Sequence, residues 1–367
     1  MKLNILLTAI FLVGTAGVAV AESSHSAKLG LVSSYDINGE DVTPEDQTGE
    51  EQDSIFKVHY ARLNFKGNLN NSLAYRLRFR LNKDGLAVKD DGLDGSVDYA
   101  WIEHAVGSGK IRLGKQANEV CAYEQKWGSY RRYHMSAACA AGDRFKYNVG
   151  VSYSHKIGAA KLGLGIGNRT NSFDTKETGM ATSLWYEGKY FDGLLQPRLT
   201  YSTFSHSEQV DAAGDVIADE ASGSDTNIGF GLRMESNNIL GELEYVSFTD
   251  ANLTVAGGDD STTSSINLNL RYTAGAFTPF FKFETSQAAT DTDSVYINDA
   301  SGAGAAAHDA KSGMSLGFEY KPWSDSDFEY FVYHQQDTYS DSTTGSAVVD
   351  VKDTVTRLGF RTNISLL

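Results

Sequence analysis

The chain has 367 residues, of which only 4 are proline, whereas 36 are glycine, 19 tyrosine and 18 phenylalanine. This composition suits a fold of many strands with aromatic belts better than a helical one. The formal net charge of −15 argues against a protein that binds nucleic acid through a basic surface.

The first 21 residues read as an export signal. Lys2 precedes a mostly apolar run from Ile5 to Val13, and Ala19, Val20 and Ala21 are the small residues that favour cleavage before residue 22. A membrane anchor fits less well, because the apolar run is shorter than the roughly 20 residues that a bilayer requires. We therefore predict a signal peptide at residues 1–21 and a mature chain at residues 22–367.

Apolar and polar residues alternate with a period of two along most of the mature chain, which is typical of strands. The pattern predicts sixteen strands, at residues 28–37, 56–69, 73–82, 96–106, 110–116, 144–155, 161–167, 180–189, 195–205, 227–235, 240–248, 265–273, 277–285, 313–321, 328–335 and 354–366.

Short and long connections alternate between these strands, and every odd-numbered strand precedes a long one. An up-and-down meander with short periplasmic turns gives this rhythm, whereas a Greek-key sandwich has no reason to keep it. Strands of about ten residues are long enough to cross a hydrocarbon layer, where only a closed sheet satisfies every backbone group. The sequence therefore predicts an all-β protein: a 16-stranded antiparallel up-and-down transmembrane β-barrel.

The stretch YRLRFRLN, residues 75–82, shows the alternation most clearly. We expect Arg76, Arg78 and Arg80 to line the inside of the barrel, while the large apolar residues between them face lipid. A barrel of sixteen strands is too wide for side chains alone to fill, so its lumen should hold water. These features predict a pore.

Two segments resemble a known family. VHYARLNFKGNLNNSLAYRLRFRLN resembles the early strand pair of the phosphate-selective porin group, and IRLGKQANEV resembles the point where porins send their third loop into the barrel. The resemblance implies a passive, usually trimeric channel in the outer membrane of a Gram-negative bacterium, with an inward-folded third loop. Its expected partners are membrane lipid, lipopolysaccharide, small ions and hydrophilic solutes.

Such a channel selects its solutes through the charges at its narrowest point. The candidates for this constriction are Arg76, Arg78, Arg80, Glu119, Glu124, Lys126, Tyr130, Arg131, Arg132 and Tyr133. Charges in a narrow lumen act at close range, whereas distant exposed charges are screened, so the arginines predict a modest preference for anions. Two alternatives stay open: the arginines only keep the lumen wet, or the third loop packs outside the pore.

Cys121 and Cys139 fall in the same predicted loop of an exported chain, which predicts a disulfide, with two buried free thiols as the alternative. In a chain-entropy view, closing a loop of this length is worth roughly 3 kcal/mol.

No GxSxG, HExxH, phosphate-loop or cysteine–histidine metal spacing occurs in the sequence. We therefore expect no enzymatic activity, no metal and no cofactor. The competing interpretation of the chain is a non-conducting structural or adhesive outer-membrane barrel.

Overall fold

The computed structural model describes residues 23–41, 54–81, 97–127, 135–143, 146–168, 179–205, 224–250, 261–288, 295–296, 307–308, 310–340 and 351–366. The predicted signal peptide at residues 1–21 and most of the long connections lie outside these ranges.

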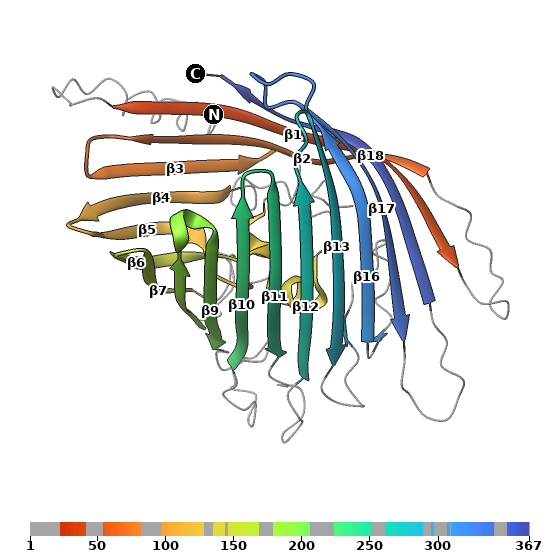
Figure 1. Ribbon diagram of the computed structural model, residues 1–367. Helices are drawn as coiled ribbons and strands as arrows, with labels where there is room; N and C mark the ends of the chain where they lie inside the picture. The colour runs from red at the N-terminus through yellow and green to blue at the C-terminus, as the bar shows by residue number, and fades with distance from the viewer. Residues whose placement is uncertain are drawn as a thin grey trace, which may run out of the picture.

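Sixteen strands of the described residues form one closed antiparallel barrel (Figure 1). Those of the first half are β1 (Ser24–Asp41), β2 (Ser54–Asn68), β3 (Leu73–Arg80), β4 (Val97–Val106), β5 (Gly109–Ala117), β6 (Tyr147–Ile157), β7 (Ala160–Asn168) and β8 (Met180–Gly188). Those of the second half are β9 (Leu195–Ser205), β10 (Ser224–Ser236), β11 (Ile239–Asp250), β12 (Ser261–Tyr272), β13 (Phe277–Ala288), β16 (Ala310–Tyr320), β17 (Glu329–Ser340) and β18 (Val351–Ser365). Each strand pairs with its neighbours along the chain, and β18 closes the barrel on β1, as predicted.

The barrel reverses the usual arrangement of a soluble protein, because its apolar residues point outwards. On β11, Leu243 and Tyr245 are 49% and 41% exposed, whereas Glu242 and Glu244 are only 2% and 3% exposed. A soluble sheet would bury the leucine and tyrosine and leave the glutamates in water. The outer face therefore fits lipid, and the polar face turns towards the lumen.

Tight turns join the strands at the short connections. Gly107, between β4 and β5, has φ +60°, and Gly158, between β6 and β7, has φ +56°. Residues with a β-carbon rarely adopt this left-handed backbone, so glycine suits both turns.

Five short elements were not predicted. They are η1 (Glu124–Lys126), α3 (Ala137–Asp143), η2 (Phe191–Gly193), β14 (Val295–Tyr296) and β15 (Ala307–His308). The first two lie between β5 and β6 and belong to the third loop, which we define by its described residues, 118–127 and 135–143. Within the described part of the chain, no helix is long and apolar enough to cross a membrane.

Candidate functional site

A row of arginines lies on the inner wall where β2, β3 and β4 meet. Asp98 of β4, which is 5% exposed, forms ion pairs with three of them. Its carboxylate oxygens lie 2.9 Å from Nη2 of Arg78, 3.1 Å from Nη2 of Arg80 and 3.6 Å from Nε of Arg62. One carboxylate thus serves three guanidinium groups, and this part of the wall keeps a net positive charge.

Aromatic rings hold these guanidinium groups in place. The guanidinium carbons of Arg76 and Arg78 lie 4.3 and 4.2 Å from the centroid of the Tyr99 ring, which is cation–π geometry. Arg78 also donates a 2.6 Å hydrogen bond to the hydroxyl of Tyr147. Tyr147 belongs to β6, and two strands separate β6 from β3, so this contact runs through the inside of the barrel. The row therefore faces inwards and is preorganised.

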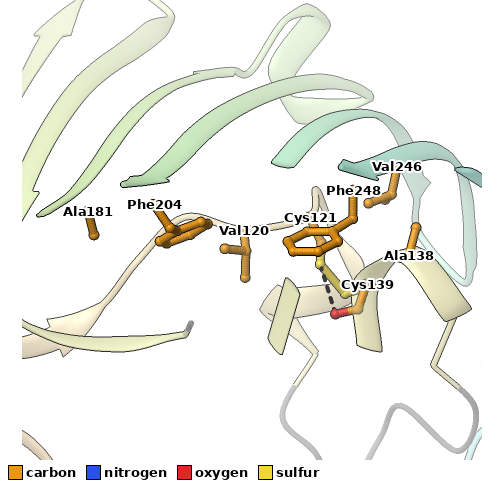
Figure 2. Close-up of a cluster of buried hydrophobic side chains, with 8 residues drawn as sticks. All are labelled: Val120, Cys121, Ala138, Cys139, Ala181, Phe204, Val246 and Phe248. Carbon is orange, nitrogen blue, oxygen red and sulfur yellow. Dashed lines mark hydrogen bonds between the residues drawn. A yellow bond between two sulfur atoms is a disulfide. The ribbon is translucent and has the colours of Figure 1, made fainter. Parts of the chain in front are cut away.

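The third loop packs against the inner wall on the opposite part of the sheet through an apolar cluster (Figure 2). The loop contributes Val120, Cys121, Ala138 and Cys139, and the wall contributes Ala181, Phe204, Val246 and Phe248. All eight are at most 2% exposed. Alternation places these four wall residues on the inner face, where polar residues are expected. Apolar residues at inner-face positions are therefore the sequence signal that could have shown which part of the wall the loop covers.

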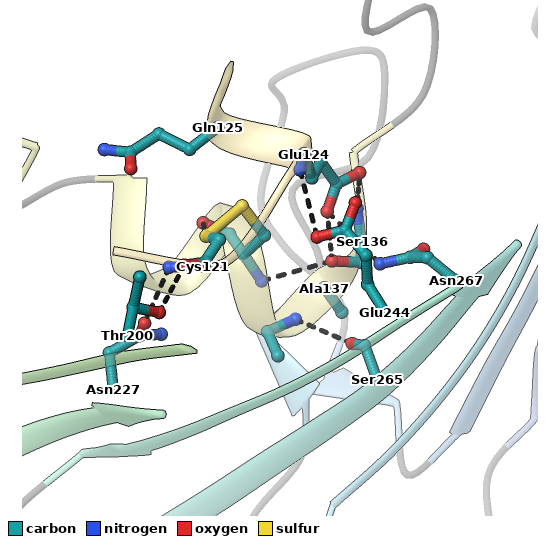
Figure 3. The surroundings of a disulfide bond; sticks show 12 residues. Cys121, Glu124, Gln125, Ser136, Ala137, Thr200, Asn227, Glu244, Ser265 and Asn267 are labelled. Atoms are coloured by element: carbon teal, nitrogen blue, oxygen red, sulfur yellow. Dashed lines mark hydrogen bonds between the residues drawn. A yellow bond between two sulfur atoms is a disulfide. The ribbon is translucent and has the colours of Figure 1, made fainter. Parts of the chain in front are cut away.

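Cys121 and Cys139 form a disulfide with their Cα atoms 5.5 Å apart. It lies against the wall, as Figure 3 shows: Cys121 N–H donates a 2.7 Å hydrogen bond to Oδ1 of Asn227, and the hydroxyl of Thr200 donates to the Cys121 carbonyl. The disulfide thus joins the two arms of the third loop at the point where the loop rests on β9 and β10.

We expect unreduced protein from outer membranes to show no free thiol, because the chain's only two cysteines are bonded to each other. Alkylation of the unfolded, unreduced protein followed by mass spectrometry should leave both cysteines unlabelled, whereas a reduced sample should carry two labels. Labelling of both cysteines without reductant would contradict the disulfide.

A charged group joins the base of the third loop to β8 and β9. Arg198, whose side chain is completely buried, is paired with Glu119 and with Glu187. Lys126 lies 3.4 Å from the Glu119 carboxylate and 2.8 Å from that of Glu187. Burial alone would raise the pKa of Glu119, but Lys126 and Arg198 lower it to about 2. Glu119 is therefore ionised at neutral pH.

Six of the ten predicted constriction residues are among the described residues, and they lie in three different environments. Arg76, Arg78 and Arg80 lie on the inner wall, and Glu119 and Lys126 remain partly exposed beside it. Glu124, which was expected to face the lumen, is only 1% exposed and lies between the third loop and the wall. The remaining four, Tyr130, Arg131, Arg132 and Tyr133, lie outside the described residues.

Sequence reasoning missed several partners of these residues, among them Asp98, Tyr99, Tyr147 and Glu187. Alternation does not readily assign Asp98 to the inner or the outer face, because the pairing of β3 with β4 shifts register between Arg78 and Phe79. Among the described residues, no group of three or more histidine, cysteine, aspartate or glutamate side chains is placed to hold a metal ion.

Comparison with known proteins gives one family and several solved structures. The sequence model of the phosphate-selective porins O and P matches residues 28–278. No curated protein matches the sequence.

Among solved structures, OmpT of Vibrio cholerae is 13% identical with a TM-score of 0.62, covering 95% of this chain and 99% of that one. The channel DcaP of Acinetobacter baumannii is 11% identical, with a TM-score of 0.61 and coverages of 94% and 98%. An anion-selective porin from Comamonas acidovorans is 14% identical, with a TM-score of 0.59 and coverages of 94% and 100%. At these identities the likeness shows the fold.

Proposed function

Because the chain belongs to the phosphate-selective porin O and P family and is an outer-membrane channel of a Gram-negative bacterium, we propose that it lets small ions and hydrophilic solutes diffuse passively through its lumen, with a preference for anions. The observation that carries the anion preference is the arginine row, in which three guanidinium groups share the carboxylate of Asp98. In a lumen these charges act on each passing ion at close range and with little screening.

The third loop supplies the narrow part of this proposed path. Its described residues contact side chains of the inner wall from β8 to β13, and these contacts support a loop that takes up space inside the barrel. The arginine row lies on the part of the wall opposite the third loop. A passing solute would then meet guanidinium groups on one side and the loop on the other, which is the arrangement that selects by size and charge.

Three further parts of the proposal rest on the family and on the sequence. Residues 1–21 direct export and are removed. The channel assembles as a homotrimer surrounded by lipid and lipopolysaccharide; one solved form of Vibrio cholerae OmpT, to which the chain is similar, is described as a trimer. It needs no cofactor and carries out no catalysis, since passive diffusion needs neither.

The test is conductance of the purified mature protein in a planar lipid bilayer. We expect stable, discrete current steps, and in a potassium chloride gradient a reversal potential of the sign that chloride preference gives. A folded, inserted barrel that passes no current would contradict the channel and favour a structural or adhesive barrel. A conducting pore with cation preference would leave the channel standing and remove the anion preference.

A further inference from the structure

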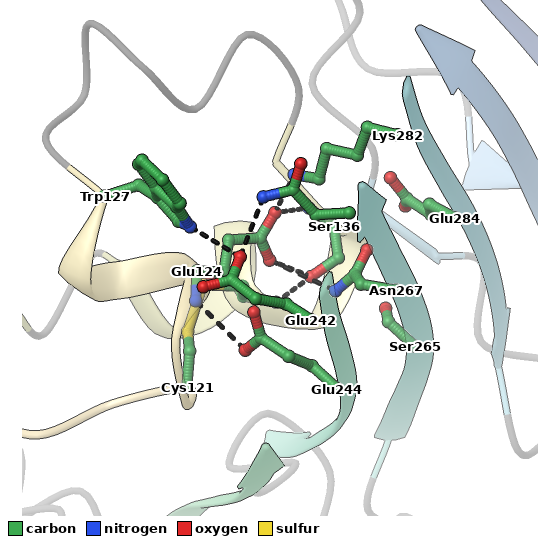
Figure 4. Close-up of polar contacts among 12 residues, drawn as sticks. Cys121, Glu124, Trp127, Ser136, Glu242, Glu244, Ser265, Asn267, Lys282 and Glu284 are labelled. Carbon is green, nitrogen blue, oxygen red and sulfur yellow. Dashed lines mark hydrogen bonds and ion pairs between the residues drawn. A yellow bond between two sulfur atoms is a disulfide. The ribbon is translucent and has the colours of Figure 1, made fainter. Parts of the chain in front are cut away.

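One buried carboxylate, that of Glu124, ties together both arms of the third loop and two strands of the wall (Figure 4). Its oxygens accept hydrogen bonds from the backbone N–H of Ser136 at 2.9 Å and from the Ser136 hydroxyl at 2.6 Å. They also accept from Nζ of Lys282, on β13, at 2.5 Å and from Nδ2 of Asn267, on β12, at 3.3 Å. These four donors come from three separate parts of the chain.

The backbone around Glu124 is attached to the same wall. The N–H of Glu124 donates to Oε2 of Glu244, on β11, at 3.0 Å. In the other arm, the N–H of Ala137 donates to Glu284 of β13 and that of Ala138 donates to Ser265 of β12, both at 3.0 Å. The first N–H groups of a helix have no partner within the helix, so these wall side chains satisfy the start of α3.

The contacts of Glu124 require an ionised carboxylate. An amide has a single acceptor oxygen and turns an NH₂ group towards donors, so it cannot accept from Ser136, Asn267 and Lys282 together. Burial alone would raise the pKa of Glu124, but the Lys282 ammonium and the bonds from Ser136 hold it below its ordinary value. Bonds to charged groups are also the strongest of the hydrogen bonds that hold the loop.

We propose that Glu124 is the positioning residue that holds the third loop against the inner wall of β11, β12 and β13, and that its release lets the loop move into the conducting path. The second half of this inference rests on the proposed channel function. The first half does not, because it concerns only how the loop is attached.

The experiment compares wild type with Glu124→Gln in two measurements. The first is the rate at which a small thiol reductant cleaves the Cys121–Cys139 disulfide in the folded, detergent-solubilised barrel. Both cysteines are fully buried, so cleavage requires the loop to leave the wall. We expect the rate to rise about tenfold or more, since hydrogen bonds to a charged group are worth at least that factor.

The second measurement is single-channel recording, in which we expect closures to sub-conductance levels about tenfold more often than in wild type. The matched control is Glu103→Gln on β4. The Glu103 carboxylate is also paired with cations, at 2.7 Å from Lys110 and 2.6 Å from Arg112, but these are neighbours on the wall. This control should behave as wild type in both measurements.

Ser136→Ala gives a milder version of the same test, because it removes one hydroxyl donor to Glu124 and leaves the buried charge paired. Ser136→Ala should raise both the rate of disulfide reduction and the frequency of closures, by a smaller factor than Glu124→Gln. It replaces Glu124→Gln in the experiment if the glutamine variant does not fold. A change of electrophoretic mobility on heating verifies that each barrel is folded.

An unchanged reduction rate in the folded variants would overturn the attachment by Glu124. Faster reduction with unchanged channel records would overturn its control of the conducting path. Faster reduction in a barrel that never conducts, wild type included, would support the attachment and refute the proposed channel function instead.

Discussion

Replacing Arg76, Arg78 and Arg80 together by serine is expected to abolish the anion preference and to move the reversal potential in a salt gradient to near zero. In the wild type Arg78, Arg80 and Arg62 share the single carboxylate of Asp98, while Arg76 donates a 2.9 Å hydrogen bond to the side-chain oxygen of Asn64. After the change one arginine and one aspartate remain, and the local charge is balanced. At physiological salt, charges farther than about 8 Å are largely screened, so the exposed acidic residues elsewhere cannot compensate.

Two single variants control this experiment. Asp98→Asn removes the shared carboxylate and should strengthen the anion preference. Lys156→Ser removes an exposed positive charge at the end of β6, beside the turn to β7, and should leave the reversal potential unchanged. A triple serine variant with the wild-type reversal potential would show that the arginine row does not set selectivity.

The substitution Leu243→Arg is expected to destabilise the barrel by about 2–4 kcal/mol, because it places a charge on the lipid face near the middle of β11. Leu243 is 49% exposed on the outer face, between Glu242 and Glu244 on the inner one. Urea unfolding of the protein in lipid vesicles, followed by tryptophan fluorescence and heat-dependent mobility, measures the loss of free energy of unfolding.

The matched control for this prediction is Ile239→Arg, at the first residue of the same strand. Ile239 is 59% exposed and also points outwards, but it lies beside the turn, where an arginine should cost only about 0–1 kcal/mol. Equal losses of free energy of unfolding for the two variants would contradict the placement of Leu243 in the middle of the hydrocarbon layer and of Ile239 at its edge.

The sequence by itself determined the barrel, since the alternation of side chains along a strand is a local property. Strand β9 has the predicted bounds, at Leu195–Ser205. Several strands extend beyond the prediction at the ends that meet the long connections, and β12, for example, begins at Ser261 rather than at residue 265, whereas β6 begins later than predicted, at Tyr147. The residues added to β12 are serines and threonines, in which apolar and polar positions cannot be distinguished, so alternation gives no signal there.

Alternation also predicted which side chains of β3 face the lumen, and so placed Arg76, Arg78 and Arg80 on the inner wall. It could not supply the partners of that row, because they come from other strands and the register of β3 on β4 shifts beside Arg78. A shift of one residue exchanges the two faces of a strand. Asp98 therefore became recognisable as the shared carboxylate only in the folded barrel.

The position of Glu124 was decided by the tertiary structure alone. The sequence places this residue in a polar loop, where a carboxylate is expected to face water. Its partners Ser136, Asn267 and Lys282 lie 12, 143 and 158 residues further along the chain. Only the closure of the barrel brings these strands beneath the third loop, and burying a carboxylate is favourable only where such donors surround it.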